Sequence, residues 1–554
     1  MAFLGMPLEI VSEVLQYLGA IDLVACRRCC RTLASLISSP TFQYKLLLGS
    51  VSMIDGLTSM SQYSVVERLS ALQAYQAAWH SASPRPLKTL YSGCITPYLV
   101  LPFSGSVLPL LSGLDRLVLR LISPACSIRL KPYRDWSLDL ASYNLRPHFC
   151  ATDQSQELLV LCGSLVASPS IIRCHLLHLS NNDNLQSHPS ATAPCITVSC
   201  VFPNARTVKV AIRGALLGWL WFDSPPELRV YNWRTGQMVW RCPMSTGFFD
   251  FAFLDDHYLL IVQAHRLLVY TIDLDAVVAI GTTHWYELDP SSVPSATCLL
   301  GLPSVIDGAV LYIKTFSSRR PYSTIGRQSL FEMDPSCATI AFTVSVTTSI
   351  CAPFEQYLII VPVSAIIAAL DTTMFYKAVE MAEASGPLTL QWQCWGARSL
   401  ILPFFHREAP QWYLTGLSAV GNKIALAFLC PEPYPSLVDV FVFDVQDAGD
   451  LEGPNPIDPR DFLPPSNHED CTPQLLSFPI CNRLSYRLIR KAFTYDEHVD
   501  SSWLDHSIHL MDDGIAFTAW DFDDTTSEVY LISIDAGESG RSTTPMVSEV
   551  NGAR

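Results

Sequence analysis

The chain has 554 residues, of which 49% are hydrophobic and 16% charged, so more than one domain and a large buried core are expected. The formal net charge of −15 disfavours a nucleic-acid-binding groove, because the affinity of such grooves comes largely from Lys and Arg. Many of the eighteen cysteines lie in apolar stretches, as at Cys162 and Cys200, and the first residues do not resemble a signal peptide. We therefore expect free thiols and a cytoplasmic and/or nuclear location.

The first forty residues predict three short helices. The first carries apolar residues at helical spacing, namely Ile10, Val11, Val14, Leu15 and Leu18. Pro7 suits its first turn, and Gly19 is expected to end it. Asp22 is expected to cap a second helix over 23–30, and a third is expected over 32–38. Three helices in about thirty-five residues are too few to bury a core alone, so they need a partner surface.

These residues resemble the F-box. The matching positions are Met6-Pro7-Leu8-Glu9-Ile10, Val14-Leu15-Gln16-Tyr17-Leu18, Asp22-Leu23, Cys29-Cys30-Arg31, Leu33 and Leu36-Ile37. Met6 replaces the usual Leu, Leu33 the usual Trp, and Ser39-Pro40-Thr41-Phe42 the usual closing segment. The resemblance implies docking onto a Skp-type adaptor, and through it onto a cullin, in an SCF ubiquitin ligase whose protein substrate is bound by the rest of the chain. The alternative is an ordinary N-terminal helical cap.

The resemblance also assigns the residues that face the adaptor. They are Met6, Pro7, Leu8, Ile10, Val14, Leu15, Leu18, Asp22, Leu23, Cys30, Arg31 and Leu33. We place the F-box at residues 1–48.

A linker and a stalk helix are expected over residues 49–86, with a loop over 49–62. Ser64 and Glu67 have the spacing of a capping box, and apolar residues follow at Leu69, Leu72, Tyr75 and Trp79. This helix resembles the one that follows the F-box in a large group of fungal (basidiomycete) F-box proteins. The prolines of Ser83-Pro84-Arg85-Pro86 are expected to end it.

From residue 87 to 535 the pattern changes to short β-type runs separated by Gly, Pro, Asp and Asn. Roughly twenty-eight such runs, at four per blade, predict a β-propeller-like substrate-binding domain of about seven blades. The segment 228–240 predicts a hairpin with Thr235-Gly236 at its tip and resembles the outer hairpin of a WD40-like blade. A pair of packed sheets, a sandwich, is the main alternative. Residues 536–554 are expected to be a disordered tail.

Three insertions interrupt the strands. Residues 180–194 are polar and expected to be mobile, 371–384 carry a helical pattern, and 444–473 are expected to be an exposed proline-rich loop. The apolar run 357–370 is too short for a bilayer span and predicts a strand followed by a helix from near Ser364. The fungal resemblance continues in Trp392-Gln393-Cys394-Trp395-Gly396.

Candidate chemical sites are few. Cys26 and Cys29 have zinc-like spacing without a second pair, His506 and His509 are expected on opposite faces of a strand, and Asp521-x-Asp523-Asp524 lacks the glycine of a calcium loop. Arg483, Arg487, Arg490 and Lys491 form a basic spot that either receives an acidic or phosphorylated segment or is a charged outer strand. Trp219, Trp221, Trp233, Trp240, Trp392 and Trp395 are interpreted as packing residues rather than a ligand cage.

The sequence therefore predicts a mainly β protein with a small α-helical N-terminal module. We expect that it has no catalytic site, binds no cofactor or metal, and has neither a nucleic acid nor a membrane as a partner. Three hypotheses remain: a substrate receptor of an SCF ligase, an F-box scaffold that does not transfer ubiquitin, and a propeller enzyme with a central channel lined by paired carboxylates and His.

Overall fold

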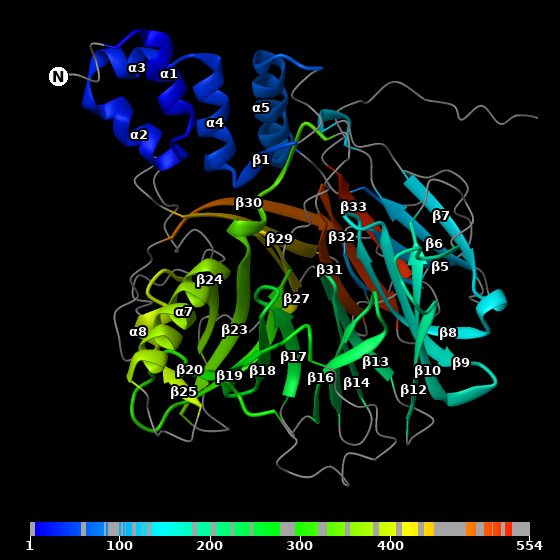
Figure 1. Cartoon of the computed structure of the whole chain (residues 1–554). Helices are drawn as coiled ribbons and strands as arrows, with labels where there is room; N and C mark the ends of the chain where they lie inside the picture. Colours follow the sequence, from blue (N-terminus) through cyan, green and yellow to red (C-terminus); the bar gives the residue numbers. More distant parts are fainter. Residues whose placement is uncertain are drawn as a thin grey trace, which may run out of the picture.

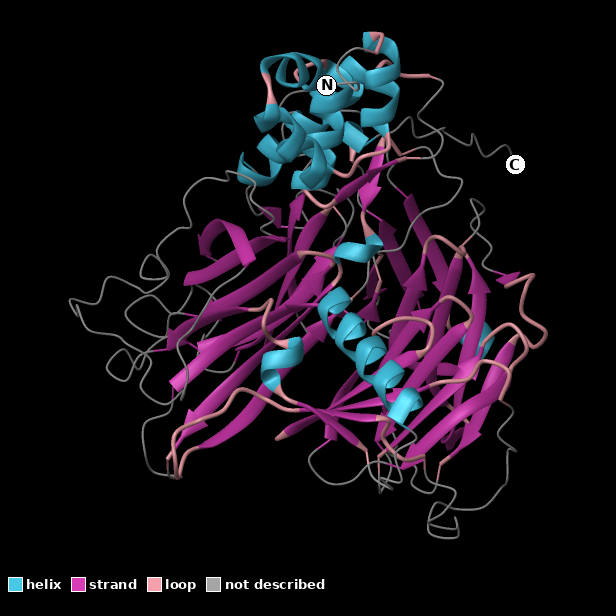
Figure 2. Ribbon diagram, turned by 60° about the vertical axis from the view of Figure 1, so that its left-hand side comes forward, coloured by secondary structure: helices cyan, strands magenta, loops and turns pink. Residues whose placement is uncertain are grey.

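The computed structural model separates a group of helices from a large body of strands (Figure 1). The residues that it describes are 6–56, 62–81, 85–86, 99–100, 103–105, 107–112, 118–123, 126–129, 134–179, 186–200, 206–222, 226–243, 248–276, 294–319, 329–348, 355–380, 387–405, 413–429, 437–447, 484–494, 504–511, 513–521 and 527–533. The five N-terminal helices gather at one end, and strands fill most of the remainder (Figure 2).

The N-terminal module has four helices. They are α1 (Leu8–Gln16), α2 (Ala20–Cys29), α3 (Arg31–Ile37) and α4 (Pro40–Ser50). Their shared core consists of Val11, Leu15, Leu23, Leu33, Ile37 and Phe42. The three predicted helices are confirmed, and the start of α4 completes a core that three helices alone would leave open.

Two predicted helix caps in this module are wrong. Gly19 is the N-cap of α2 rather than the end of α1, whose C-cap is Tyr17. Asp22 lies in the first turn of α2, where a carboxylate favours the positive end of the helix dipole, instead of capping the helix from outside.

The stalk helix α5 (Val65–Ser81) follows a short strand, β1 (Met53–Asp55), which lies within the segment predicted to be a loop. The capping box is confirmed, because Ser64 N–H donates to Glu67 Oε2 over 2.7 Å and Glu67 N–H donates to Ser64 Oγ over 3.3 Å. Strand β1 pairs with β22 (Phe331–Met333), far along the chain.

Seven larger sheets form the strand-rich body of the described residues, and all strands of the first four except β25 precede those of sheets 5 and 6. Sheet 1 is β3-β5-β6-β7 (Leu99–Val100, Leu108–Ser112, Val118–Ser123, Arg134–Asp139). Sheet 2 is β11-β10-β9-β8-β4 with β12 beside β10 (in chain order Phe103–Ser104, Leu145–Asp153, Leu158–Leu165, Ser168–His178, Gln186–Ser187, Cys195–Ser199). Sheet 3 is β13-β14-β15-β16 (Arg206–Arg213, Leu216–Phe222, Glu227–Asn232, Gln237–Pro243). Sheet 4 is β17-β18-β19-β20-β25 (Phe248–Phe253, Tyr258–Gln263, Arg266–Thr271, Cys298–Leu300, Leu388–Leu390).

Three sheets follow. Sheet 5 is β21-β23-β24-β26 (Val310–Ser318, Thr339–Thr347, Glu355–Pro362, Leu400–Phe405). Sheet 6 is β27-β28-β29-β30 (Tyr413–Val420, Lys423–Leu429, Leu437–Asp447, Leu484–Thr494). Sheet 7 is β2-β33-β32-β31 (Arg85–Pro86, Ser527–Ser533, Gly514–Asp521, Leu504–Met511).

Each sheet packs against two neighbours, which closes the sheets into a ring. Separate clusters of buried side chains join sheets 1 and 2, 2 and 3, 3 and 4, 4 and 5, 5 and 6, and 6 and 7. A further cluster joins sheet 7 back to sheet 1 through Met511 and Leu531 on one side and Leu108 and Leu110 on the other. A sandwich would bury one face of each of two sheets, so this packing excludes that alternative and establishes a β-propeller.

The prediction of about seven blades is corrected: six sheets count as blades, and a seventh, composite sheet completes the ring. Six sheets are built mainly from neighbouring stretches of chain and form six blades of the expected kind. The remaining sheet is a composite, because β2 from residues 85–86 pairs with β33 from the far end of the strand-rich region. A propeller that begins at residue 87, as predicted, therefore leaves out strand β2, which pairs with the propeller strand β33.

Several local predictions can be compared with the structure. The hairpin of β15 and β16 turns at Thr235 and at Gly236, whose φ of 72° suits glycine. Strand β24 leads into α7 (Val363–Glu380), as expected for the run 357–370. The prediction that residues 180–194 are mobile is wrong in part, because β11 pairs with β10 and His188 is buried. Most of the predicted loop 444–473 and the whole tail 536–554 lie outside the described residues. None of the described helices has the length and apolarity needed to cross a bilayer.

Candidate adaptor-binding surface

Among the described residues of the N-terminal module, six large apolar side chains are exposed. Their exposed fractions are 40% for Met6, 53% for Leu8, 49% for Ile10, 41% for Val14, 82% for Tyr17 and 53% for Ile21. They project from α1, from its N-terminal flank and from the start of α2, while the core of the module is already filled by other residues. We call these six residues the apolar stripe. Ile10, Val14 and Tyr17 are four and three positions apart and share one face of the helix, so we treat this surface as the candidate interaction site.

The predicted adaptor residues divide between this stripe and the core. Met6, Leu8, Ile10 and Val14 belong to the stripe. Pro7, Asp22 and Arg31 are also exposed. Leu15, Leu23 and Leu33 are buried within the module, with exposed fractions of at most 7%. Leu18 and Cys30 are half-buried against the same core. The three buried leucines therefore stabilise the module and do not present side chains to a partner.

Tyr17 and Ile21 were not among the predicted adaptor residues. The helical spacing of the first helix could have indicated Tyr17, which is three residues after Val14. Ile21 escaped notice because the second helix was predicted to begin at Leu23, whereas α2 begins at Ala20.

Charged and aromatic groups join α4 of the module to β1 and α5. Tyr44 Oη donates to Asp55 Oδ1 over 2.8 Å, Arg68 forms an ion pair with the same carboxylate, and the Arg68 guanidinium lies 5.1 Å from the Tyr44 ring centroid. Burial, followed by the negative charge of Asp55, raises the pKa of Tyr44 well above its ordinary value, so the phenol stays a hydrogen-bond donor at neutral pH.

The innermost strands of the ring place few titratable groups together. Lys209 on β13 donates to Asp250 Oδ1 on β17 over 2.6 Å, and burial raises the pKa of Asp250 despite this partner. His509 on β31 packs on Phe103, with ring centroids 4.6 Å apart, and its pKa is lowered to about 4 by burial and then by Arg319. Among the described residues, these inner-strand groups are therefore a carboxylate paired with Lys and an imidazole packed on an aromatic ring.

The other candidate sites have structural explanations. Trp219, Trp221 and Trp233 lie in the cluster between sheets 2 and 3, and the other three tryptophans lie in two further clusters, which confirms their interpretation as packing residues. Cys29 is exposed, and the described residues contain no group of three or more potential metal ligands. Arg487, Arg490 and Lys491 lie on β30, the outer strand of sheet 6. Arg483, Asp523 and Asp524 lie outside the described residues.

Comparison with known proteins agrees with the helical module. Residues 3–45 match the F-box domain family. No curated protein matches the chain. Among solved structures, the C-terminal WD40 domain of Sif2 is 10% identical, with 81% of this chain and 98% of that chain covered and a TM-score of 0.36. BamB from Moraxella catarrhalis is 8% identical, with 81% and 95% covered and a TM-score of 0.31, and a chain of the Mitotic Checkpoint Complex is 8% identical, with 81% and 94% covered and a TM-score of 0.34.

The TM-scores of these structures are too low to support the fold, which is established by the order of the sheets and the clusters between them. The chain thus combines an N-terminal segment that matches the F-box domain family with a β-propeller. This architecture is typical of non-enzymatic adaptor and scaffold proteins.

Proposed function

We propose that this protein is the substrate-recognition subunit of an SCF-type cullin-RING ubiquitin ligase. In this role the apolar stripe docks onto a Skp-type adaptor, the adaptor connects it to a cullin, and the propeller binds a protein target. The resemblance to fungal F-box proteins and a cytoplasmic and/or nuclear location belong to the same proposal. The match of residues 3–45 to the F-box supports it, because F-box domains generally bind Skp-type adaptors.

The apolar stripe is the observation that carries the proposal. The core of the module forms without these six side chains, so burying them against a partner would gain free energy. Apolar anchors buried at the centre of such an interface each contribute about 2 kcal/mol or more.

The test is a binding titration of the full-length protein with a purified Skp-type adaptor. Replacing Ile10 and Val14 together with alanine is expected to weaken binding by about 4 kcal/mol, roughly a thousandfold in Kd. The matched control replaces Val66 and Val166, which are 60% and 64% exposed but lie outside the module, and is expected to leave Kd unchanged. Equal Kd values for the Ile10/Val14 variant and the unmodified protein would reject the adaptor role.

A scaffold that binds the adaptor without ubiquitin transfer is the second candidate, and the same stripe serves it equally well. The two differ in the fate of the bound target. Ubiquitylation of a propeller-bound protein in a ligase reconstituted from adaptor, cullin and RING subunit supports the receptor, whereas binding without ubiquitylation supports the scaffold.

A further inference from the structure

Helix α4 takes part in two separate cores. Phe42 and Leu46, four residues apart on one face of the helix, pack in the core of the helical module. Tyr44 and Leu48, on another face of the same helix, pack in the large cluster that joins sheets 6 and 7. Helix α4 therefore joins the module to the ring through two of its faces and not through a flexible linker.

Strand β1 is bound to the ring by backbone hydrogen bonds. It pairs with β22, which belongs to the connection between β21 and β23 of sheet 5. We call residues 329–337, which contain β22, the arm. Gly56 N–H donates to Leu330 O over 3.1 Å and Asp334 N–H donates to Ser52 O over 2.9 Å, so the arm is bonded on both sides of the strand pair.

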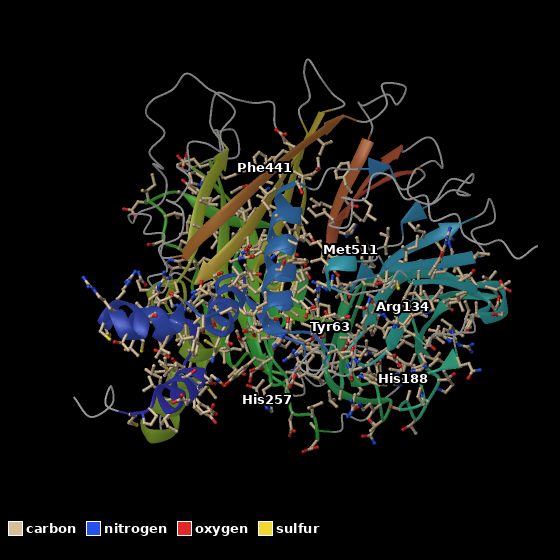
Figure 3. The ribbon with its side chains drawn as sticks, turned by 90° about the horizontal axis from the view of Figure 1, so that it is seen from above. Tyr63, Arg134, His188, His257, Phe441 and Met511 are labelled. Atoms are coloured by element: carbon tan, nitrogen blue, oxygen red, sulfur yellow. The ribbon has the colours of Figure 1, made fainter. Side chains whose placement is uncertain are left out.

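The buried face of α5 rests on the same part of the ring. Leu72, Tyr75 and Trp79 recur at helical spacing and share a cluster with Val440 of sheet 6 and Phe517 of sheet 7. The Tyr75 ring meets Phe331 of the arm edge to face, with centroids 5.3 Å apart. From above, α5 crosses the ring between the labelled residues Phe441 and Met511 (Figure 3).

A buried ion pair lies beneath α5. Arg129 Nη1 and Asp513 Oδ1 are 2.6 Å apart, and the two side chains are 6% and 1% exposed. Arg129 comes from the connection between β6 and β7 of sheet 1, and Asp513 from the turn between β31 and β32 of sheet 7. Arg129 Nε also donates to Phe331 O of the arm over 3.0 Å, and its guanidinium lies 5.9 Å from the Tyr75 ring centroid. Breaking such a pair leaves an uncompensated buried charge, so its geometry is strongly held.

We propose that α4, β1 and α5 fold as part of the ring, and that α1 to α3 form a separate unit that packs on the other face of α4. Helix α4 then acts as a rigid lever that holds the apolar stripe in one orientation relative to the propeller. This inference rests on packing within the chain and is independent of whether an adaptor binds.

Two glycines on either side of β1 allow a matched test. A Cβ at Gly56 would lie 1.8 Å from Ser329 O in the backbone of the arm, so Gly56→Ala forces β1 and the arm apart. A Cβ at Gly49 would lie 2.4 Å from Ala20 Cβ at the start of α2, so Gly49→Ala disturbs the module instead. Both variants add one methyl group, and they lie seven positions apart in the chain.

The measurement is hydrogen–deuterium exchange with peptide resolution on the full chain alone. For Gly56→Ala we expect at least tenfold faster exchange in β22 and α5, extending into β29 and β32, with residues 8–37 unchanged. For Gly49→Ala we expect faster exchange in α1 to α3 and no change in the sheets. Faster exchange confined to residues 52–56 in Gly56→Ala would overturn the proposal, since β1 would then be only an attachment to an independent ring.

A milder variant keeps the test decisive if Gly56→Ala disrupts folding. Asp513→Asn preserves side-chain volume and removes the charge, and we expect about threefold faster exchange in α5 and the arm as well as in the β31–β32 turn. A change confined to that turn would count against coupling between the ring and α5. Failure of Gly56→Ala to fold while Gly49→Ala folds normally would support the proposal. No adaptor is present in any of these measurements, so they remain valid if adaptor binding is disproved.

Discussion

At the scale of single residues, the same residue type has different roles within two turns of one helix. Leu8 and Leu15 both belong to the F-box resemblance, yet Leu8 is 53% exposed and Leu15 is 1% exposed. Residues seven apart lie close to one face of a helix, so the difference comes from packing: Leu15 lies in the core of the module and Leu8 does not. Sequence spacing indicates which side chains are apolar on a face, and packing decides which of them stay available to a partner.

His175 provides a prediction at this scale. The side chain on β10 is buried, its ring lies edge to face with Tyr143, and its pKa is lowered to about 4, first by burial and then by Arg173. The unfolded chain, with a His pKa of about 6.5, binds more protons, so stability is lost as pH falls from about 6.5 toward 4. Between pH 7 and pH 5 the loss from this residue is about 2 kcal/mol.

Urea unfolding at the two pH values measures this effect. The substitution His175→Leu is expected to reduce the pH-dependent loss of unfolding free energy by that amount, whatever its effect at pH 7. Equal losses for the variant and the unmodified protein would show that the imidazole is protonated in the folded state at pH 5.

At the scale of elements, α5 shows two contributions of different size. Its capping box satisfies backbone N–H groups at the helix start, and its buried face fills the cluster between sheets 6 and 7. Loss of an N-cap side chain typically costs about 1 kcal/mol, whereas truncating a fully buried leucine costs about 2–5 kcal/mol. The packing of the helix should therefore contribute more to its stability than its cap.

This comparison is a prediction for two variants of the same helix. Ser64→Ala is expected to lower the free energy of unfolding by about 1 kcal/mol, and Leu72→Ala by about 3 kcal/mol. Chemical denaturation of both full-length variants under the same conditions measures the difference. A larger loss for Ser64→Ala would mean that α5 is held mainly by its own backbone and not by the ring.

At the scale of the whole molecule, the closure of the ring depends on residues from its two ends. Leu108 and Leu110 of sheet 1 meet Met511 and Leu531 of sheet 7, and β2 pairs with β33 in the same sheet. The contact between sheets 7 and 1 joins segments about four hundred residues apart, whereas each other contact joins sheets that follow one another in the chain. Loop-closure entropy makes such a long-range contact the costliest to form.

The substitution Leu531→Ala should therefore open the ring at this position. We expect faster hydrogen–deuterium exchange in β5 and β6 as well as in β32 and β33. The matched control Leu358→Ala, which removes an equally buried leucine between sheets 5 and 6, should affect only those two sheets. If exchange in β5 and β6 stayed unchanged in Leu531→Ala, sheet 7 would not be what closes sheet 1 into the ring.

The sequence by itself determined the helical module and the class of the second domain. Apolar spacing from Ile10 to Leu18 predicted α1, the pair Ser64 and Glu67 predicted the start of α5, and short runs with turns such as Thr235-Gly236 predicted antiparallel strands. These features depend on neighbours within a few positions, so they can be recognised without knowledge of distant contacts.

Only the tertiary structure decided the pairing of β1 with β22, the closure of sheet 7 by β2 and the division of the F-box leucines between core and surface. Each of these depends on residues brought together from distant parts of the chain. Residues 53–55 are too few to show a β pattern, and nothing near them in the sequence indicates the arm some 280 positions later. Their conformation comes from long-range packing and hydrogen bonding, which local sequence patterns do not encode.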